Sequence, residues 1–259
     1  MHSRFVYSLA IVCLCTTYGS AQTVRFDTNV GNFDMVLNPD NDSNLQSLVD
    51  NLLAYVEAGR YDQTVINRAV DGDDSDPSND FVLQMGSFLI DSIFPPSTAG
   101  ELTANPIERF DAVVVDADGD GAVDFSPVTN GRGTVSLALS SGGPNTGTSS
   151  FFVNLGDNSF LDSQGFVPFA EIADMTTVDL IMQLNNVDVY SQESSNLTLK
   201  DIPLIDNGSL VFIERAFELS SPAVSEGASS TGVPEPSSIL LAAGAMLLMA
   251  PFSRRSCAR

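Results

Sequence analysis

The segment that decides the fold is GTVSLALSSGGPNTGTSSFFVNLGDNSFLDSQGFVPFAEI, residues 133 to 172. TVSLALS (134–140) and SFFVNL (150–155) are short runs rich in apolar residues and bounded by turn residues, which is typical of strands, and the run Phe151-Phe152-Val153 indicates a buried one. The loop between them, with the run Gly-Gly-Pro-Asn-Thr-Gly at 142–147, consists of residues that favour turns. The segment therefore predicts two strands joined by a polar loop that runs directly into a pair of phenylalanines.

The sequence on either side of this segment predicts more short strands and two helices. A cap at Asp42 or Ser43 and an apolar stripe from Leu45 to Val56, stopped by Gly59, predict one helix, and MTTVDLIMQL (175–184) predicts another. The further predicted strands are 23–28 and 32–37, joined by a turn at Asn29-Val30-Gly31, then 63–70, 80–88, 197–205 and 209–219. Eight or so short strands with regular turn signals predict a barrel or a sandwich.

The N-terminal end has the pattern of a secretory signal peptide over residues 1–21. Arg4 precedes the short apolar run FVYSLAIVCLC (5–15), and small residues lead to a cleavage position after Ala21. The apolar run is too short for a membrane span, which is the alternative interpretation. The sequence therefore predicts an exported protein whose folded domain is residues 22–220.

The C-terminal residues 233–259 have the pattern of a sorting tail. They contain Pro-Glu-Pro, an apolar stretch at 238–252 and a basic end, and a Ser/Gly/Ala-rich linker at 221–232 precedes them. The residues alone predict a tail anchor. The order of parts resembles the PEP-CTERM signal of certain Gram-negative bacteria, which implies an exosortase-type processing enzyme as a partner, membrane contact through the tail before processing, and a final location in the cell envelope, at the cell surface or in the matrix.

Composition excludes several classes of site. The chain has 11 Lys+Arg against 33 Asp+Glu, and without the two ends 7 basic residues face 32 acidic ones, so nucleic acid is not expected as a partner. The single His and all three Cys lie in the two ends, and the chain has no Trp. Residues 22–220 therefore have no disulfide, no Cys/His zinc site and no triad that depends on His or Cys.

The segment 133–172 resembles the centre of a cyclophilin-type peptidyl-prolyl cis-trans isomerase, and the resemblance extends over residues 23–219. VRFDTNVGNFDMVL is similar to the family's opening hairpin, and YDQTVINRAV with FVLQMGSF is similar to its central strand pair. The resemblance implies an all-β fold, a closed eight-stranded antiparallel barrel capped by two helices. It also implies isomerisation of X-Pro bonds in proline-containing peptides or unfolded exported proteins, without a cofactor.

The resemblance assigns candidate site residues one by one. Arg68 matches the family's catalytic arginine, and Gln84 matches the glutamine that supports the substrate backbone. The other implied substrate-binding residues are those of the proline pocket, Phe81, Val82, Phe152 and Leu161, and two on the strand and loop that hold the peptide, Ala138 and Asn145.

Some positions differ from the family's pattern, and they leave an alternative open. Ile66-Asn67 replaces Phe-His, Ser150 replaces a glutamine, Phe160 replaces a tryptophan, and Phe166 replaces a pocket histidine. The lost glutamine and tryptophan favour a catalytically weak module that binds Pro-containing segments at the cell surface. The retained Arg68 and Phe152 favour the enzyme.

An acidic insertion at 89–132 contains VDADGDGAVD, which begins like a calcium loop. Asp116, Asp118 and Asp120 alternate as in an EF-hand, but the twelfth position is Pro127 instead of glutamate, so a complete EF-hand is excluded. The expected metal content is none, with these three aspartates as a weak candidate site beside the alternative of a solvated turn. A calcium-dependent structural protein of the envelope is the third functional hypothesis.

Overall fold

The computed structural model describes residues 21–70, 81–95, 104–188 and 201–220. The chain divides into two compact units, Met1–Ser221 and Pro222–Arg259, and every described element belongs to the first. The predicted signal peptide, linker and sorting tail lie outside the described residues, apart from Ala21. In the described ranges, none of the helices combines the length and apolarity needed to cross a bilayer.

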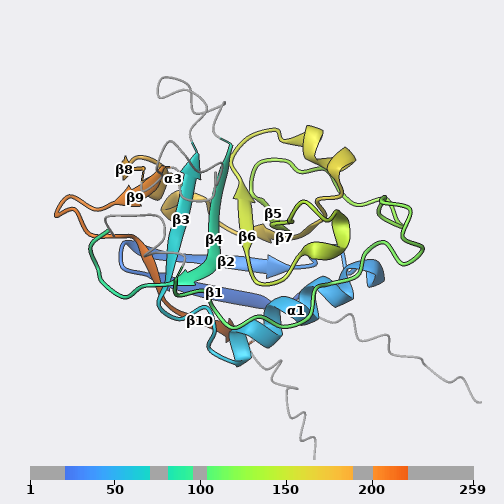
Figure 1. Ribbon diagram of the computed structural model, residues 1–259, viewed down its shortest axis with the longest axis horizontal. Helices are drawn as coiled ribbons and strands as arrows, with labels where there is room; N and C mark the ends of the chain where they lie inside the picture. The colour runs from blue at the N-terminus through green and yellow to red at the C-terminus, as the bar shows by residue number, and fades with distance from the viewer. Residues whose placement is uncertain (1–20, 71–80, 96–103, 189–200, 221–259) are drawn as a thin grey trace, which may run out of the picture. The chain divides into compact units, whose positions relative to one another are not determined.

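The described elements form a closed barrel of eight antiparallel strands in the order β1-β10-β3-β4-β6-β5-β7-β2, which confirms the expected fold (Figure 1). A separate pair, β8-β9, forms a small second sheet. The strands are β1 (Thr23–Thr28), β2 (Gly31–Leu37), β3 (Thr64–Val70), β4 (Val82–Leu89), β5 (Thr134–Leu137), β6 (Phe151–Asn154), β7 (Pro168–Ile172), β8 (Asn185–Val187), β9 (Ile202–Leu204) and β10 (Phe212–Leu219). The helices are η1 (Ser43–Leu45), α1 (Gln46–Glu57), η3 (Pro144–Thr146), η4 (Ser159–Gln164) and α3 (Thr176–Met182).

Two strand predictions need correction. The predicted strand 197–205 is not part of the barrel, because its described part contributes only β9, which pairs with β8. The eighth barrel strand is β7, between β5 and β2, which the sequence patterns did not predict as a strand. β7 is short and begins with Pro168, and a proline is tolerated in a sheet mainly at a strand's first residue or an edge.

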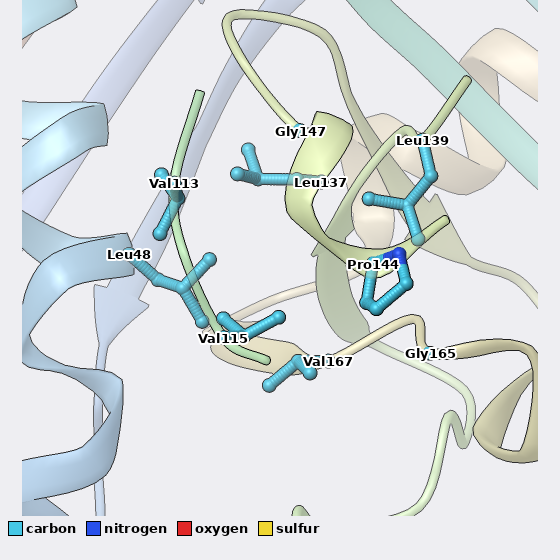
Figure 2. Close-up of a pocket in the computed structure, with 9 residues that line it drawn as sticks. All are labelled: Leu48, Val113, Val115, Leu137, Leu139, Pro144, Gly147, Gly165 and Val167. Atoms are coloured by element: carbon cyan, nitrogen blue, oxygen red, sulfur yellow. The ribbon is translucent and has the colours of Figure 1, made fainter. Parts of the chain in front are cut away.

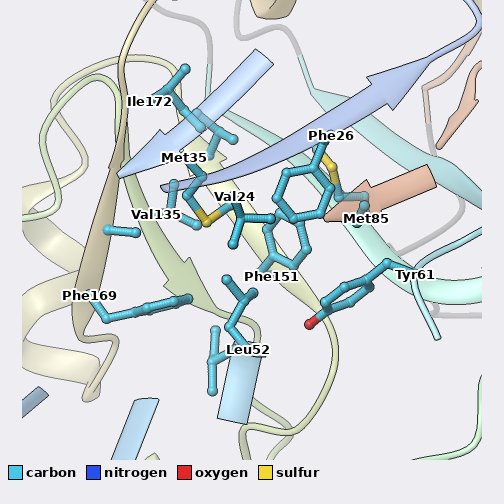
Figure 3. Packing of buried hydrophobic residues seen from close by; sticks show 14 of the residues in the cluster. Val24, Phe26, Met35, Leu52, Tyr61, Met85, Val135, Phe151, Phe169 and Ile172 are labelled. Carbon is cyan, nitrogen blue, oxygen red and sulfur yellow. The ribbon is translucent and has the colours of Figure 1, made fainter. Parts of the chain in front are cut away.

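The barrel interior is filled by the alternate residues of its strands and closed by α1. In β1 and β2 every second side chain is buried, as the alternation predicted. Leu48, Val49, Leu52, Tyr55 and Val56 form the buried stripe of α1, and Asp42 caps the short η1 turn that precedes α1. Figure 3 shows Leu52 directed into the core with the aromatic rings.

An aromatic cluster occupies the middle of this core. Phe26 stacks on Phe33 with ring centroids 5.1 Å apart, and Phe151 lies 5.4 Å from Phe26 and 5.5 Å from Tyr61. The Tyr61 hydroxyl donates to the Ser149 carbonyl at 2.9 Å, so the one polar atom of this cluster has a partner. Burial raises the pKa of Tyr61 well above its ordinary value. The cluster fixes the base of the loop that leads into Phe151.

Gly86 allows β4 to pass close to this cluster. Its φ of +80° lies in the left-handed region, and a Cβ there would lie 2.7 Å from the Ser149 carbonyl oxygen and 2.9 Å from the Tyr61 ring. A side chain at this position would therefore meet both backbone strain and a steric clash.

Replacing Gly86 with alanine is expected to lower the free energy of unfolding by about 3 kcal/mol, because the strain of a positive φ adds to overpacking. Gly208→Ala is the matched control, since Gly208 has the same φ of +80° and no atom within 4 Å of its would-be Cβ. It should lose only about 1 kcal/mol. Urea unfolding of residues 21–220, here called the barrel unit, measures both. Equal losses would show that the close contact at Gly86 does not constrain the fold. The barrel unit has its own core and a closed sheet, so it can be studied alone.

Candidate functional site

The candidate site around Arg68 lies on the outer face of the barrel. A β-bulge at Asn67 directs the Arg68 side chain to this outer face. Ile66 pairs with Met85 and Arg68 pairs with Gln84, so two steps along β3 match one step along β4. Ile66 and Met85 belong to the barrel interior. Without the extra residue, Arg68 would also face the interior, because side chains two apart on a strand share a face.

A second, smaller apolar cluster forms on this outer face. Gln84 pairs with Phe152 across β4 and β6, so Arg68, Gln84 and Phe152 lie in one row across three strands. Around Phe152 are the buried Val82 and Leu161 and the half-buried Phe81, Ala138 and Phe166. The structure thus brings together all five apolar residues that the resemblance assigned to substrate binding, beside the arginine.

Aromatic rings form two sides of this cluster. The Phe152 and Phe166 rings meet edge to face with centroids 5.5 Å apart. Phe81 stacks on Phe160 at 5.7 Å, and Phe160 is 54% exposed, so this wall opens to solvent. Phe160 and Phe166, which were noted in the sequence as departures from the family's pattern, therefore extend the same surface.

Arg68 lies at the edge of the cluster with its guanidinium carbon 5.6 Å from the centroid of the Phe81 ring. Its Nε is buried and has no hydrogen-bond partner among the described residues. Burial lowers the pKa of Arg68, and the charge of Asp201 acts in the opposite direction. Since arginine stays protonated in proteins, the site holds a charged donor with an uncommitted N–H beside an apolar surface.

Gln84 is almost fully buried, and its amide is held from one side. Its Nε2 donates to the Ser150 Oγ at 3.1 Å, and the Ser87 Oγ lies 2.9 Å from the same Ser150 oxygen. Ser150 was noted in the sequence only as the loss of a longer amide. The structure shows that its hydroxyl contacts the side chain next to Arg68.

Asn145 is the one candidate residue that the structure does not bring into this cluster. Its Oδ1 accepts from the amides of Val115 at 2.8 Å and Asp116 at 3.0 Å, and its Nδ2 donates to the Asp116 carbonyl. All three bonds attach the 142–147 loop to the insertion 89–132. The side-chain amide of Asn145 is thus committed to backbone groups of the insertion, and its predicted role in substrate binding stays a prediction.

A buried network of asparagines connects η4 with the strands beside the apolar cluster around Phe152, and the sequence analysis did not predict it. Asn158 donates to the Phe81 carbonyl at 2.8 Å and to Asn154 Oδ1 at 2.9 Å, and Asn154 in turn donates to Asn130 Oδ1. Asn130 donates to Asp162 of η4 at 2.8 Å. The network joins η4, which contributes Leu161, to the start of β4. Single asparagines give no sequence signal of this kind, because the same residue type is common in solvated turns.

The acidic loop of the insertion is largely satisfied by its own backbone. Carboxylate oxygens of Asp116, Asp118 and Asp120 lie within 4.8 Å of one another. Asp116 accepts from the amides of Gly119 and Gly121 at 2.8 and 2.9 Å. Burial raises the pKa of Asp116, but the hydrogen bonds from Gly121 and Gly119 outweigh it and the net shift is downward. These contacts describe an ordered acidic turn.

A small apolar crevice lies between α1, the insertion and the 142–147 loop, and it shares no residue with the cluster around Phe152. Figure 2 shows Leu48, Val113 and Val115 on one side and Leu137, Leu139 and Pro144 on the other. All of its side chains are apolar, so it offers no group for chemistry. It marks where the insertion packs on the loop, and the Val113 amide donates to the Gly147 carbonyl at 2.9 Å.

Loss of the asparagine network that connects η4 to the strands should lower the free energy of unfolding. Asn158→Ala is expected to lower the free energy of unfolding by about 1–3 kcal/mol, because the buried Asn154 Oδ1 loses its donor and the Phe81 carbonyl keeps only the Leu155 amide. Gln164→Ala is the control in the same short helix, since Gln164 is exposed and makes one bond of 3.3 Å to Phe160; it should change stability by less than about 0.5 kcal/mol. Urea unfolding compares the two variants. A loss for Asn158→Ala no larger than the control's would show that the network does not hold η4.

Comparisons with known proteins agree with this fold. The family model described as cyclophilin type peptidyl-prolyl cis-trans isomerase/CLD matches residues 23–206. Peptidyl-prolyl cis-trans isomerase cyp18 of Streptomyces antibioticus is 30% identical over 56% of this chain and 69% of its own length. Peptidyl-prolyl cis-trans isomerase B of Escherichia coli K12 is 30% identical over 61% of this chain and 82% of its own length.

A solved structure shows the same fold. The crystal structure of a cyclophilin type peptidyl-prolyl cis-trans isomerase of Cryptosporidium parvum, in the presence of the dipeptide Ala-Pro, has a TM-score of 0.50 and 21% identity, and the match covers 77% of this chain and all of that one. At this identity the likeness supports the fold alone. The family model, which covers well over half of the chain, carries the assignment: the chain belongs to the cyclophilin-type peptidyl-prolyl cis-trans isomerases.

Proposed function

We propose that the outer-face site catalyses cis/trans isomerisation of X-Pro bonds in exported or cell-envelope proteins, with Arg68 as the catalytic residue. The reaction suits the residues available. Its barrier of roughly 18–20 kcal/mol comes from amide resonance, and no covalent bond is made or broken. The reaction therefore needs no nucleophile, metal or cofactor, which agrees with a domain that contains neither His nor Cys.

The observation that carries the proposal is the buried, uncommitted Nε of Arg68 beside the apolar cluster around Phe152. As the prolyl amide twists, resonance is lost and the nitrogen lone pair becomes an acceptor. A fixed guanidinium N–H stabilises this state more than the planar amide, and such preorganised donors are usually the largest catalytic contribution. Because Arg68 is already desolvated, little reorganisation is needed when the peptide binds.

The apolar cluster supplies the second requirement, a place for the proline ring. Phe152 and Leu161, each about 5% exposed or less, are the residues proposed as the base of the proline pocket, and Phe81 contacts both this cluster and the Arg68 guanidinium. Burial of the proline ring in this pocket would hold the proline in place while the residue before it rotates about the X-Pro bond. Gln84, in the row between Arg68 and Phe152, is the residue placed to hold the peptide backbone.

A catalytically weak binding module is the second candidate function. It is favoured by Ser150, whose short side chain is engaged with Gln84 and replaces a longer amide that would reach the peptide. Such a module would retain the proline pocket and bind the same peptides without accelerating exchange. Activity measurements separate the two candidates.

The two ends of the chain support a proposal about location. The signal pattern of 1–21 and the Pro-Glu-Pro tail of 233–259 suit export followed by removal of the tail by an exosortase-type enzyme. The domain boundaries at residues 22 and 220 follow from the same proposal. The large excess of acidic residues suits a solvated, exported surface.

Processing is tested by the intact mass of the protein recovered outside cells of a bacterium that carries such a sorting enzyme. The expected product begins at Gln22 and lacks the apolar stretch 238–252, because the predicted cleavage positions lie after Ala21 and near the Pro-Glu-Pro motif. Replacing residues 234–236 by alanines should leave the tail attached, whereas alanines at Ser229 and Ser230 of the linker should leave processing unchanged. Recovery of an extracellular wild-type protein with the intact tail would contradict the proposal.

Catalysis is tested by the refolding of a protein whose slow phase is limited by prolyl isomerisation. The wild-type barrel unit should accelerate this phase, and Arg68→Ala should reduce kcat/KM roughly 100-fold or more, because the donor to the twisted amide is lost. Arg68→Lys should also be impaired, since lysine keeps the charge without the planar set of N–H groups.

Arg215→Ala is the matched control. Arg215 is an exposed arginine of β10 that pairs with Asp27 at 3.2 Å, and its loss should leave kcat/KM unchanged. A folded wild-type unit that binds Pro-containing peptides without accelerating refolding would reject the enzyme in favour of the binding module. Full activity in Arg68→Ala would reject Arg68 as the catalytic residue.

A further inference from the structure

The hydroxyl of Ser150 has three close polar neighbours on the outer face of the barrel. The Met85 carbonyl oxygen lies 3.2 Å from the Ser150 Oγ, the Ser87 Oγ lies 2.9 Å away, and Gln84 Nε2 lies 3.1 Å away. Gln84 and Ser87 are each 6% exposed, so water has little access to compete for these contacts.

Counting protons leaves one arrangement that satisfies all three contacts. A serine hydroxyl has one proton and two acceptor sites, and a carbonyl oxygen can only accept. The Ser150 proton must therefore go to Met85, and Ser87 must donate its own proton to Ser150. The remaining acceptor site of Ser150 must receive an N–H from Gln84. The orientation of the Gln84 amide, which is otherwise ambiguous, follows from the chemistry of its neighbours.

From this arrangement we infer that Ser150, supported by Ser87, is a positioning residue that fixes the Gln84 amide with its carbonyl oxygen turned toward the peptide site. The inference rests on the proposed function and extends it to a pair of serines. With Nε2 held by Ser150, Oε1 is the acceptor that Gln84 presents beside Arg68, where a substrate N–H can donate to it.

The orientation matters because Arg68 has only donors. An amide turned the other way would place an NH₂ group next to the guanidinium and remove the one acceptor from the row. The side chains of this row would then offer donors alone, and a peptide N–H directed at Gln84 would lose its acceptor. Ser150 thus acts on the reaction through Gln84 and needs no contact with the peptide.

A double-mutant cycle in the barrel unit tests this role. Ser150→Ala should lower kcat/KM roughly three- to tenfold, the effect of one hydrogen bond, while Ser87→Ala should have a smaller effect in the same direction. In a Gln84→Ala background, Ser150→Ala should cause no further loss, because the side chain through which it acts is absent. Ser92→Ala, in an exposed loop, is the control and should leave kcat/KM unchanged. An equal loss in both backgrounds, or no loss in either, would overturn the inference.

The side-chain amide signals of Gln84 in a ¹⁵N NMR spectrum give a second measurement that does not depend on activity. Ser150→Ala should shift these signals, and Ser150→Thr, which keeps the hydroxyl, should restore them together with kcat/KM. Gln84 signals that do not change in Ser150→Ala would overturn the inference even if the enzyme is active. An inactive wild-type unit would instead reject the proposed function, and the same signals would still decide whether Ser150 holds Gln84.

Discussion

The extra residue in β3 is the constraint on which the outer-face site depends. A regular strand would send Ile66 and Arg68 to the same side, and that side is the interior of a closed barrel. A charged guanidinium there would have to be desolvated among aromatic rings, which is strongly unfavourable. The bulge at Asn67 lets β3 contribute Ile66 to the core and Arg68 to the outer face. Burial of the core residues fixes the register between β3 and β4. This register in turn fixes the position of Arg68.

The rest of the site follows from neighbours in that register. Gln84 and Phe152 lie in the same row because β4 and β6 continue the antiparallel pairing, and Leu161 of η4 completes the apolar cluster around Phe152. η4 contacts the strands through Leu161 and Phe160, and a polar network of Asn130, Asn154 and Asn158 also connects it to them. Strands therefore set the direction of each side chain, and buried hydrogen bonds set the distance of the opposing wall. A reaction that needs only an apolar pocket and an oriented donor can be built from these parts.

The sequence predicted the architecture well where periodicity carries the information. The alternation in β1 and β2 and the stripe of α1 follow directly from burial of one face, and the resemblance of 133–172 to a known family led to the closed barrel. It failed at β7, where Pro168 obscures a short strand, and at the predicted strand 197–205, whose described part contributes only β9 of the second sheet. Asn145 and Ser150 are residues whose contacts could not be predicted from the sequence. Each has a role set by side chains or backbone far away in the chain, and a single sequence does not show which distant groups satisfy a polar side chain.

The most direct measurement is NMR of the ¹⁵N-labelled barrel unit with a short peptide that contains one Ala-Pro bond. Exchange spectra of the peptide report interconversion of its cis and trans forms at equilibrium, and amide shifts of the protein report where the peptide binds. We expect exchange that becomes visible only with the protein present, together with shifts at Gln84, Ala138 and Phe152. Exchange accompanied by shifts confined to another face of the barrel would contradict this expectation, as would binding at these three residues with no exchange.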